Sequence, residues 1–339
     1  MAIDRNLNRV VFCLKQYLLL IGLVVTSGLA WTQSSTDPSN FPQKPVKVII
    51  PGGVGSGPDT LTRLITAKMA ELWGQPVVVE NIAGAGGNMG HDRVAKAGPD
   101  GYTLLVGMIG PMAINPSLQE GKLPFDPIKD FQPISMISRY PNILVVHPSL
   151  PMKNLNELLA YARNNPGRLR YGTPGSGTTP HLSAVMLSTM ADIKLLEVPY
   201  KSSAQMTTDL IAGHIDMMFL NPGAVLQHVK SGALKAIAIT SPTRQAYAAD
   251  LPTMIESGLP NYEVSSWYGL FAPSTTPKSV VDKINSDLIK VIRTPEMMQN
   301  FSVRGDEAFT GTVEQAGNYL KSEVNKWNRV IKAGNIRIE

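Results

Sequence analysis

The sequence predicts an α/β protein built from two lobes. Its 339 residues are 43% hydrophobic and 17% charged, a composition typical of a globular chain long enough for two domains. From Phe41 onward, short apolar strands alternate with amphipathic helices, which favours parallel sheets joined by right-handed crossovers. Two longer extended segments, 131–149 and 261–277, interrupt the alternation. We interpret them as two crossings of the chain between the lobes.

The predicted strands are short runs rich in Val, Ile and Leu, bounded by turn residues. In chain order they are "VKVII" (46–50), "PVVVEN" (76–81), "YTLLVG" (102–107), "NILVVHP" (142–148), "RLRYGT" (168–173), "LLEVPY" (195–200), "IDMMFLN" (215–221) and "LKAIAIT" (234–240). Most are separated by a segment in which apolar residues recur at helical spacing. Such helices are expected at 59–74, 154–165 and 180–191, with two more at 277–294 and 312–334.

The two crossings define the expected domains. Lobe one comprises 41–138 plus 268–339, and lobe two is the inserted stretch 139–267. The two final helices are expected to pack back on lobe one. A tandem of two domains joined by a single linker stays open as the alternative, because composition alone does not exclude it.

The first residues predict an export signal. Arg5, Arg9 and Lys15 precede an apolar run at 17–30, and a polar segment follows, which is the order found in secretory signal peptides. We therefore expect a signal peptide over 1–32. A retained membrane anchor is the alternative, although the run is shorter than the roughly 20 residues that a spanning helix needs.

Charge and cysteine content narrow the function classes. The formal net charge is +5, and Lys and Arg are scattered along the chain, which argues against a nucleic-acid partner. The only cysteine, Cys13, lies within the predicted signal. The mature chain would then carry no thiol, which excludes cysteine catalysis and thiolate metal sites.

Three glycine-rich turns follow predicted strands, at 52–59, 81–90 and 172–181. In open α/β sheets, ligands bind beyond the carboxyl ends of the strands, where such turns gather. Glycine lets backbone N–H groups approach a ligand, and a helix N-terminus just beyond favours negative charge. The turns therefore predict an anion site. Nucleotide phosphate is disfavoured, since G-x-G-x-x-G fails at Pro58 and Met89 and no Walker sequence occurs.

An enzyme is the competing interpretation. The G-x-S-x-G pattern is broken around both Ser56 and Ser176, so no nucleophile elbow is recognisable. A secreted hydrolase or lyase could still use His181 with Ser176 or Asp59. The structural alternatives are that His181 orients a loop and that Asp59 caps a helix, with Arg63 one helical turn further along the chain. The other histidines lack metal-ligand spacing; they are His91, His147, His214 and His228.

With these turns in place, the chain resembles the Bug receptors, the periplasmic solute-binding proteins of tripartite tricarboxylate transporters. The similarity covers nearly the whole mature chain, with its motifs in order. They are the run from "FPQKPVKVIIPGG" to "GPDGYTLLVG", then "YGTPGSGTTPHLSA", "VPYKSSAQMTTDLIAGHIDMMF", "ALKAIAIT" and "LPTMIESGLPNYEVSSWYGLFAP". The resemblance implies a type II Venus flytrap fold, with two lobes joined by two crossing strands. It also implies a monomer in the periplasm that needs neither cofactor nor metal.

The resemblance further implies that carboxylates of the ligand meet backbone N–H groups, small hydroxyls and bridging waters. Carried over by position, the residues of lobe one are Gly55, Ser56, Gly57, Asp59, Ala83, Gly84, Ala85 and Gly86. Those of lobe two are Ser176, Gly177, Thr178, His181, Lys201, Ser202, Ser203 and Asn221. Ser202 and Ser203 have helix capping as an equal alternative.

The chain departs from the family pattern at three places. Glycine follows Pro51 where the family usually has phenylalanine, and 201–203 read Lys-Ser-Ser instead of Lys-Gly-Gly. After "YTLLVG", Met108, Ile109 and Met112 replace the small hydroxyl residues usual there. Methionine adapts to rings and chains alike, so we expect Met108 to help form an apolar wall that suits an aromatic or longer-chain acid.

The leading hypothesis is a receptor that captures a small mono- or dicarboxylate by closure of its lobes. It would deliver that ligand to the permease of a tripartite tricarboxylate transporter or to a sensor. The enzyme hypothesis predicts turnover instead. A purely structural envelope protein would not require converging glycine turns.

Overall fold

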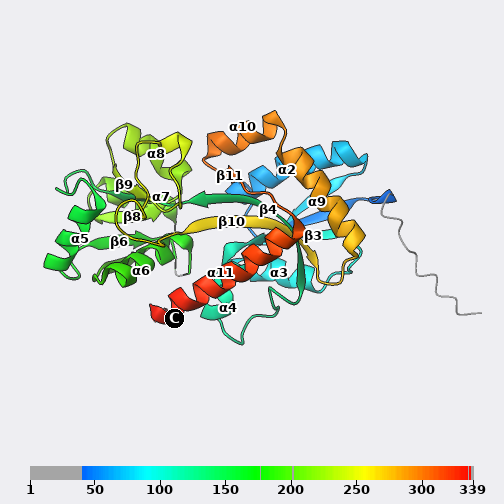
Figure 1. The fold of residues 1–339 in the computed structure, drawn as a ribbon, viewed down its shortest axis with the longest axis horizontal. Helices are drawn as coiled ribbons and strands as arrows, with labels where there is room; N and C mark the ends of the chain where they lie inside the picture. The colour runs from blue at the N-terminus through cyan, green and yellow to red at the C-terminus, as the bar shows by residue number, and fades with distance from the viewer. Residues whose placement is uncertain (1–39, 176, 201, 335, 337–339) are drawn as a thin grey trace, which may run out of the picture. The chain divides into compact units, whose positions relative to one another are not determined.

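The computed structural model describes residues 40–175, 177–200, 202–334 and 336, and the fold concerns the compact unit that begins at Phe41. The signal peptide expected over 1–32 lies outside the described residues. Two sheets organise the unit, and Figure 1 shows them as separate groups of strands linked by β4 and β10. Among the helices of the described part, none has the length and apolar character to cross a bilayer.

The first sheet has the strand order β11-β4-β10-β3-β1-β2. Its strands are β1 (Val46–Ile50), β2 (Val77–Asn81), β3 (Thr103–Met108), β4 (Phe131–Pro141), β10 (Ser265–Pro273) and β11 (Glu307–Ala308). Alternate residues of β1 enter different cores: Val48 and Ile50 pack with the helices of one face, and Ile49 with those of the other. This period of two is what a strand buried on both faces requires.

Helices cover both faces of the first sheet. α2 (Gly57–Trp73), α9 (Lys278–Ile292) and α10 (Pro295–Arg304) contribute to one core, and α3 (Asn88–Ala95) and α11 (Val313–Ala333) to the other. The turns near the sheet edge are η2 (Ala85–Gly87), the π-helical η3 (Gly110–Ile114) and α4 (Asn115–Leu118). α9 and α11 contact β4, as expected for the two final helices.

The second sheet has the order β7-β6-β8-β5-β9. Its strands are β5 (Ile143–Val146), β6 (Arg170–Thr173), β7 (Leu196–Pro199), β8 (Met217–Leu220) and β9 (Lys235–Ile239). α5 (Leu155–Asn164) and α6 (Thr179–Ala191) share a core with one face, while α7 (Ser203–Ile211) and α8 (Pro222–Lys230) cover the other. A short turn, η4 (Ala246–Ala248), follows β9.

The chain changes sheet twice. β4 runs directly into β5 through Asn142, and the segment after β9 returns the chain to the first sheet as β10. We call the first sheet with its helices the first lobe and the second sheet with its helices the second lobe. The boundaries expected at 138/139 and 267/268 fall inside β4 and β10, and the division into domains stays a prediction.

In each sheet a strand that enters from the other lobe runs opposite to its neighbours, where the alternation of strands and helices had predicted parallel sheets; in the first sheet the short β11 also pairs antiparallel, with β4. β10 pairs antiparallel with both β3 and β4, and β5 pairs antiparallel with both β8 and β9. The reason is that each of these strands enters from the other lobe. β10 and β5 therefore begin at the sheet edge where the other main strands of their sheets end.

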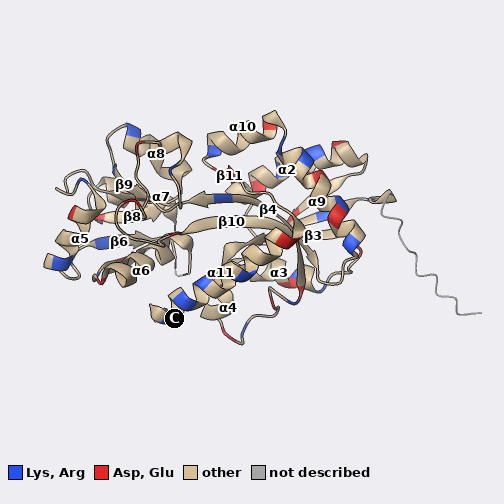
Figure 2. Cartoon of the chain, in the orientation of Figure 1, with Lys and Arg blue, Asp and Glu red and all other residues tan. Residues whose placement is uncertain are grey.

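Figure 2 shows charged positions of both signs scattered over helices and loops, with successive basic positions in the last turns of α11, where Lys326, Arg329 and Lys332 lie. The β10 strand carries no charged residue, and β4 carries only Arg139. The connection between the lobes is thus largely apolar and hydroxyl-bearing. That composition determines the floor of the site described next.

Candidate functional site

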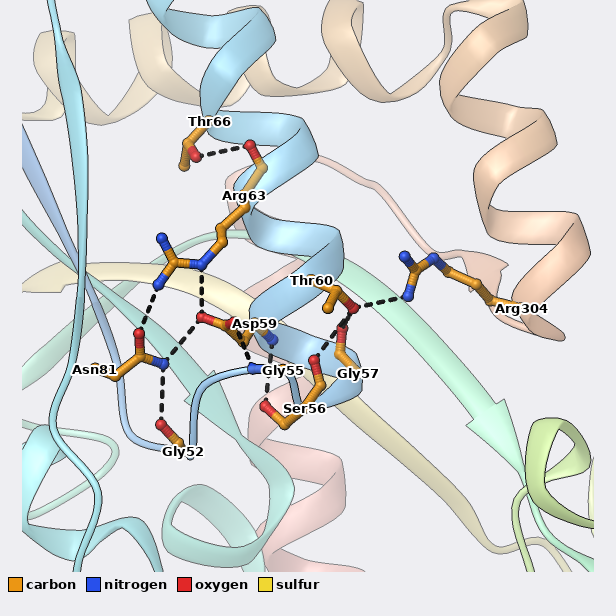
Figure 3. A network of polar contacts seen from close by, with 10 residues as sticks. All are labelled: Gly52, Gly55, Ser56, Gly57, Asp59, Thr60, Arg63, Thr66, Asn81 and Arg304. Carbon is orange, nitrogen blue, oxygen red and sulfur yellow. Dashed lines mark hydrogen bonds and ion pairs between the residues drawn. The ribbon is translucent and has the colours of Figure 1, made fainter.

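Asp59 holds the first glycine turn together (Figure 3). Its carboxylate accepts hydrogen bonds from Gly55 N at 2.8 Å, Asn81 Nδ2 at 2.9 Å and Arg63 Nε at 3.0 Å. Asn81 also donates to the Gly52 carbonyl at 3.0 Å. Burial alone would raise the pKa of Asp59, but the bonds from Arg63, Gly55 and Asn81 outweigh it and lower the pKa. Asp59 is thus an ionised brace inside the loop.

The second glycine turn is fixed to the first by close packing. A Cβ on Gly90 would lie 2.7 Å from Pro51 Cβ and 2.9 Å from Pro51 Cα. His91 is in the same helix. Its Nδ1 atom lies 2.9 Å from the Gly87 carbonyl oxygen, and its Nε2 atom accepts a hydrogen bond from Met108 N at 3.4 Å. Burial lowers the pKa of His91 to about 4, so the ring is neutral and Nδ1 is the donor. His91 therefore ties the second turn to the end of β3.

The third glycine turn is braced by His181. Its Nδ1 accepts a hydrogen bond from Gly177 N at 3.3 Å, and its Nε2 lies 3.6 Å from Glu197. Burial lowers the pKa of His181, and Glu197 partly counteracts that. Gly177 has φ +77, and a Cβ there would lie 2.8 Å from Leu118 of the first lobe. The turn therefore favours glycine for its conformation, and a side chain there would also displace the Leu118 side chain of α4.

Hydroxyl and amide groups connect the lobes at the crossing strands. The hydroxyls of Thr179, in α6, and Ser266, in β10, share a hydrogen bond at 2.5 Å. Asn142, between β4 and β5, donates through Nδ2 to Ser183 Oγ at 3.1 Å. All four side chains are buried. The junction is thus held by neutral polar contacts that belong to both lobes.

These elements enclose a cavity of about 490 Å³ between the lobes. Among the described residues, its lining carries no charged side chain. From the first lobe come Pro58, Ala85, Gly86, Met108, Ile109, Gly110, Pro111, Ile114, Asn115 and Gln119. From the crossing strands come Tyr140, Asn142, Ser266, Trp267 and Tyr268, and from the second lobe Pro174, Gly177, Thr178, Thr179, Pro180, Ser203, Leu220 and Asn221.

Four helices present their first residues to the cavity. They are α2 through Pro58, α6 through Thr178, α7 through Ser203 and α8 through Asn221, although Pro58 itself has no N–H to donate. Helix N-termini carry unpaired N–H groups and the positive end of the helix dipole. Tyr268 also lines the cavity, while its hydroxyl is buried and has no hydrogen-bond partner among the described residues. The cavity therefore offers donors for an anion without a cationic side chain in its described lining.

The structure brings about half of the expected site residues to this cavity. Those that line it are Ala85, Gly86, Met108, Gly177, Thr178, Ser203 and Asn221. Those that do not line it are Gly55, Ser56, Gly57, Asp59, Ala83, Gly84, His181 and Ser202. Ser176 and Lys201 lie outside the described residues.

Several of the expected residues have a structural role. Asp59 and His181 are turned into their own loops, where they accept backbone N–H bonds. Ser56 and Ser202 cap α2 and α7, accepting from Asp59 N at 3.4 Å and Gln205 N at 3.3 Å. Asn221 does both, since it caps α8 through Ala224 N at 3.0 Å and lines the cavity.

The apolar wall is formed partly as expected. Met108 and Ile109 line the cavity, but Met112 lies fully buried in the core of the first lobe. The aromatic floor of Tyr140, Trp267 and Tyr268 was missed from the sequence. The signal that could have found it was the pair of extended crossing segments, because residues where both strands change lobe must face the space between the lobes.

The comparisons with known proteins agree with this architecture. The model of the Tripartite tricarboxylate transporter family receptor matches residues 61–336. Protein BugT of Bordetella pertussis is 31% identical over 317 residues, which cover 93% of this chain and 96% of BugT.

Solved structures extend the similarity. The R. palustris protein Rpa4515 with adipate has a TM-score of 0.76 and 33% identity, covering 88% of this chain and 99% of that one. MatC from Rhodopseudomonas palustris with bound malate has a TM-score of 0.71 and 31% identity, covering 86% of this chain and all of MatC. The two-lobed binding-protein fold expected from the sequence is therefore confirmed, and the chain belongs to the tripartite tricarboxylate transporter family of receptors.

Proposed function

We propose that this receptor captures a small dicarboxylate in the cavity between its lobes. The observation that carries the proposal is the convergence of the first residues of α6, α7 and α8 on one cavity, which Tyr268 also lines. Each charge-assisted hydrogen bond to a carboxylate contributes on the order of 1.5–3 kcal/mol. A few such bonds from each lobe would hold the ligand without a buried ion pair.

The shape of the lining favours a ligand with an apolar middle. Met108 and Ile109 come from the first lobe, Leu220 from the second, and Trp267 from the crossing strand. These four side chains would contact methylene groups or a ring between the two carboxylates. Similarity to the adipate-bound protein supports the same choice, so we rank adipate above malate and include an aromatic acid in the test.

Capture would couple to closure, because contacts from both lobes exist together only in a shut form. The closed receptor would act in the periplasm and present its ligand to the permease of a tripartite tricarboxylate transporter, or to a sensor. The residues expected at the cavity, including the undescribed Ser176 and Lys201, stay candidates for ligand contact.

The test is calorimetric titration of the mature protein with adipate, malate and benzoate. Asn221→Asp keeps a good helix cap but places a negative charge in the cavity lining. We expect it to weaken adipate binding at least tenfold while leaving the thermal unfolding midpoint nearly unchanged.

The matched control is Asn154→Asp. Asn154 caps α5 by accepting from Glu157 N at 2.9 Å and does not line the cavity, so this variant should bind as the wild type does. Absence of binding to all three acids would refute the proposal. Recovery of a chemically altered acid would instead support the hydrolase or lyase.

A further inference from the structure

Asp306 lies behind the floor of the cavity, between α10 and β11. Its Oδ1 accepts a hydrogen bond from Ser138 Oγ at 3.0 Å. Ser138 is fully buried in β4, where its register partner across the pair with β10 is Tyr268. One buried hydroxyl residue thus separates this carboxyl group from the strand position that presents Tyr268 to the cavity.

The charged and titratable groups around Asp306 come from five elements. Arg304 of α10 faces it, as do Tyr140 of β4, Tyr268 of β10 and Tyr247 of η4. Glu307 of β11 is adjacent in the chain, but it pairs with Arg139 at 2.7 Å. Arg304 is also engaged on its other side, donating to Thr60 Oγ1 at 2.7 Å (Figure 3).

The positive charge of Arg304 does not fully offset the cost of burying the ionised Asp306 carboxylate. Burial raises the pKa of Asp306 to about 6, although Ser138 and Arg304 both act to lower it. Two of the tyrosines that face it, Tyr140 and Tyr268, line the cavity. An anion bound against those tyrosines would therefore experience the charge of Asp306 across a poorly hydrated region, where Coulomb interactions are weakly screened.

We propose that Asp306 is a positioning residue of the ligand site, whose ionised form opposes an anion bound in the cavity against Tyr140 and Tyr268 and whose protonated form admits it. Capture of a dicarboxylate is then accompanied by uptake of a proton from solvent at Asp306. This inference rests on the proposed function, because it requires an anionic ligand in the cavity.

The direction of the effect follows from linkage. A bound anion disfavours the ionised form of Asp306 and so raises its pKa. By reciprocity, protonation of Asp306 raises the affinity for the anion by the same factor. Affinity should therefore be highest below about pH 6 and should fall as the pH rises above it.

The experiment is titration of the mature wild type with adipate at pH 6.0, 7.0 and 8.0, each in two buffers of different ionisation enthalpy. We expect proton uptake near pH 7. We also expect the affinity for adipate to fall about three- to tenfold between pH 6.0 and 8.0, because a fold-change of that size corresponds to a modest coupling free energy between two sites. Asp306→Asn should abolish the uptake and bind at pH 8.0 at least as tightly as the wild type binds at pH 6.0. Titration of adipate itself is common to both proteins and cancels in the comparison.

The matched control is Glu307→Gln, which removes the neighbouring carboxylate that pairs with Arg139. This variant should retain the wild-type pH dependence of adipate affinity. If the effect of Asp306→Asn came from a general loss of negative charge, Glu307→Gln would change that dependence as well. Adipate binding by the wild type without proton uptake at any of the three pH values would overturn the inference, whatever the variants do. Retention of uptake in Asp306→Asn would also overturn it. Failure of the wild type to bind any acid would instead refute the proposed function.

Discussion

Asp59 and Gly55 close the first glycine turn through a hydrogen bond of 2.8 Å between a buried carboxylate and a backbone N–H. Gly55 has φ +80, a conformation that glycine adopts without steric cost. The bond fixes which way the turn faces, while the carboxylate itself stays out of the cavity. Asp59 thus shapes the loop, in keeping with the structural alternative that the sequence left open for it.

Replacing Asp59 tests that role. Asp59→Asn cannot accept all three hydrogen bonds and leaves Arg63 without its charge partner, so we expect a loss of about 1–3 kcal/mol in the free energy of unfolding. The folded pKa of Asp59 is lowered, so its contribution is present above the unfolded pKa and is lost as the pH falls through the folded one. Urea unfolding at pH 7 and pH 3 measures both effects.

The control for this change is Asp282→Asn. Asp282 pairs with Lys278 on the exposed face of α9, where an ion pair contributes little. Equal losses of stability in the two variants would show that Asp59 is only another surface charge.

His91→Gln should change the acid sensitivity of folding. Because burial lowers the pKa of His91 to about 4, its stabilising contribution is complete above pH 6.5 and is lost as the pH falls from there towards 4. We expect the wild type to lose about 3 kcal/mol over that window from this residue. The variant should be less stable at pH 8 but should decline less steeply in acid, as followed by denaturant unfolding.

Exposed His214 supplies the comparison, since 70% of its side chain is accessible. His214→Gln should follow the wild-type pH profile. The role assigned to His91 would be wrong if its variant and the wild type lost stability in parallel between pH 6.5 and 4.

Gly90→Ala should disrupt the contact between the first two glycine turns. The new methyl group would lie 2.9 Å from Pro51 Cα and 3.0 Å from the Ile82 carbonyl, and backbone atoms cannot yield cheaply. We expect a loss of about 1–3 kcal/mol, although alanine ordinarily favours a helix over glycine. Chemical denaturation and adipate titration would record losses of stability and affinity together.

Gly98→Ala is the matched substitution, because a Cβ there meets nothing within 4 Å. It should change stability by no more than about 0.5 kcal/mol. A Gly90→Ala protein as stable as Gly98→Ala would mean that the two turns are not packed as described.

Asp306→Asn should increase the free energy of unfolding at alkaline pH. The folded pKa of Asp306 is raised to about 6, so the protonated form is favoured by folding, and this contribution is present below the unfolded pKa and lost as the pH rises through 6. At pH 8 the variant should therefore exceed the wild type by about 1–3 kcal/mol. The gain should vanish towards pH 4, and a constant gain at both pH values would contradict the argument.

The sequence predicted the strands well and their directions less well. All eight expected strands are present, because each is a short apolar run between turn residues. The opposed directions of β5 and β10 could not be read from those runs, since direction depends on which lobe the chain enters from. The short strand β11 and the helix α10 were not anticipated.

The candidate site, like the fold, was only partly predictable from the sequence. The glycine turns at the strand ends could be found, because glycine and helix capping leave a local pattern that one segment carries by itself. Which groups reach the cavity depends on long-range partners: Asn81 and Arg63 hold Asp59 inside its loop, and Tyr268 is placed by the pairing of β10 with β3 and β4.

Periodicity and turn chemistry by themselves predicted an α/β chain of two lobes with glycine-rich turns at its strand ends, because these properties arise within short stretches of chain; the receptor role followed from the resemblance of its motifs to the Bug receptors. Tertiary structure alone decided that the cavity floor is aromatic, that Asp59 and His181 brace loops, and that Asp306 lies behind Tyr268. The physical reason is that burial and hydrogen-bond partnership are set by residues far apart in sequence, which meet only when both crossing strands are in place.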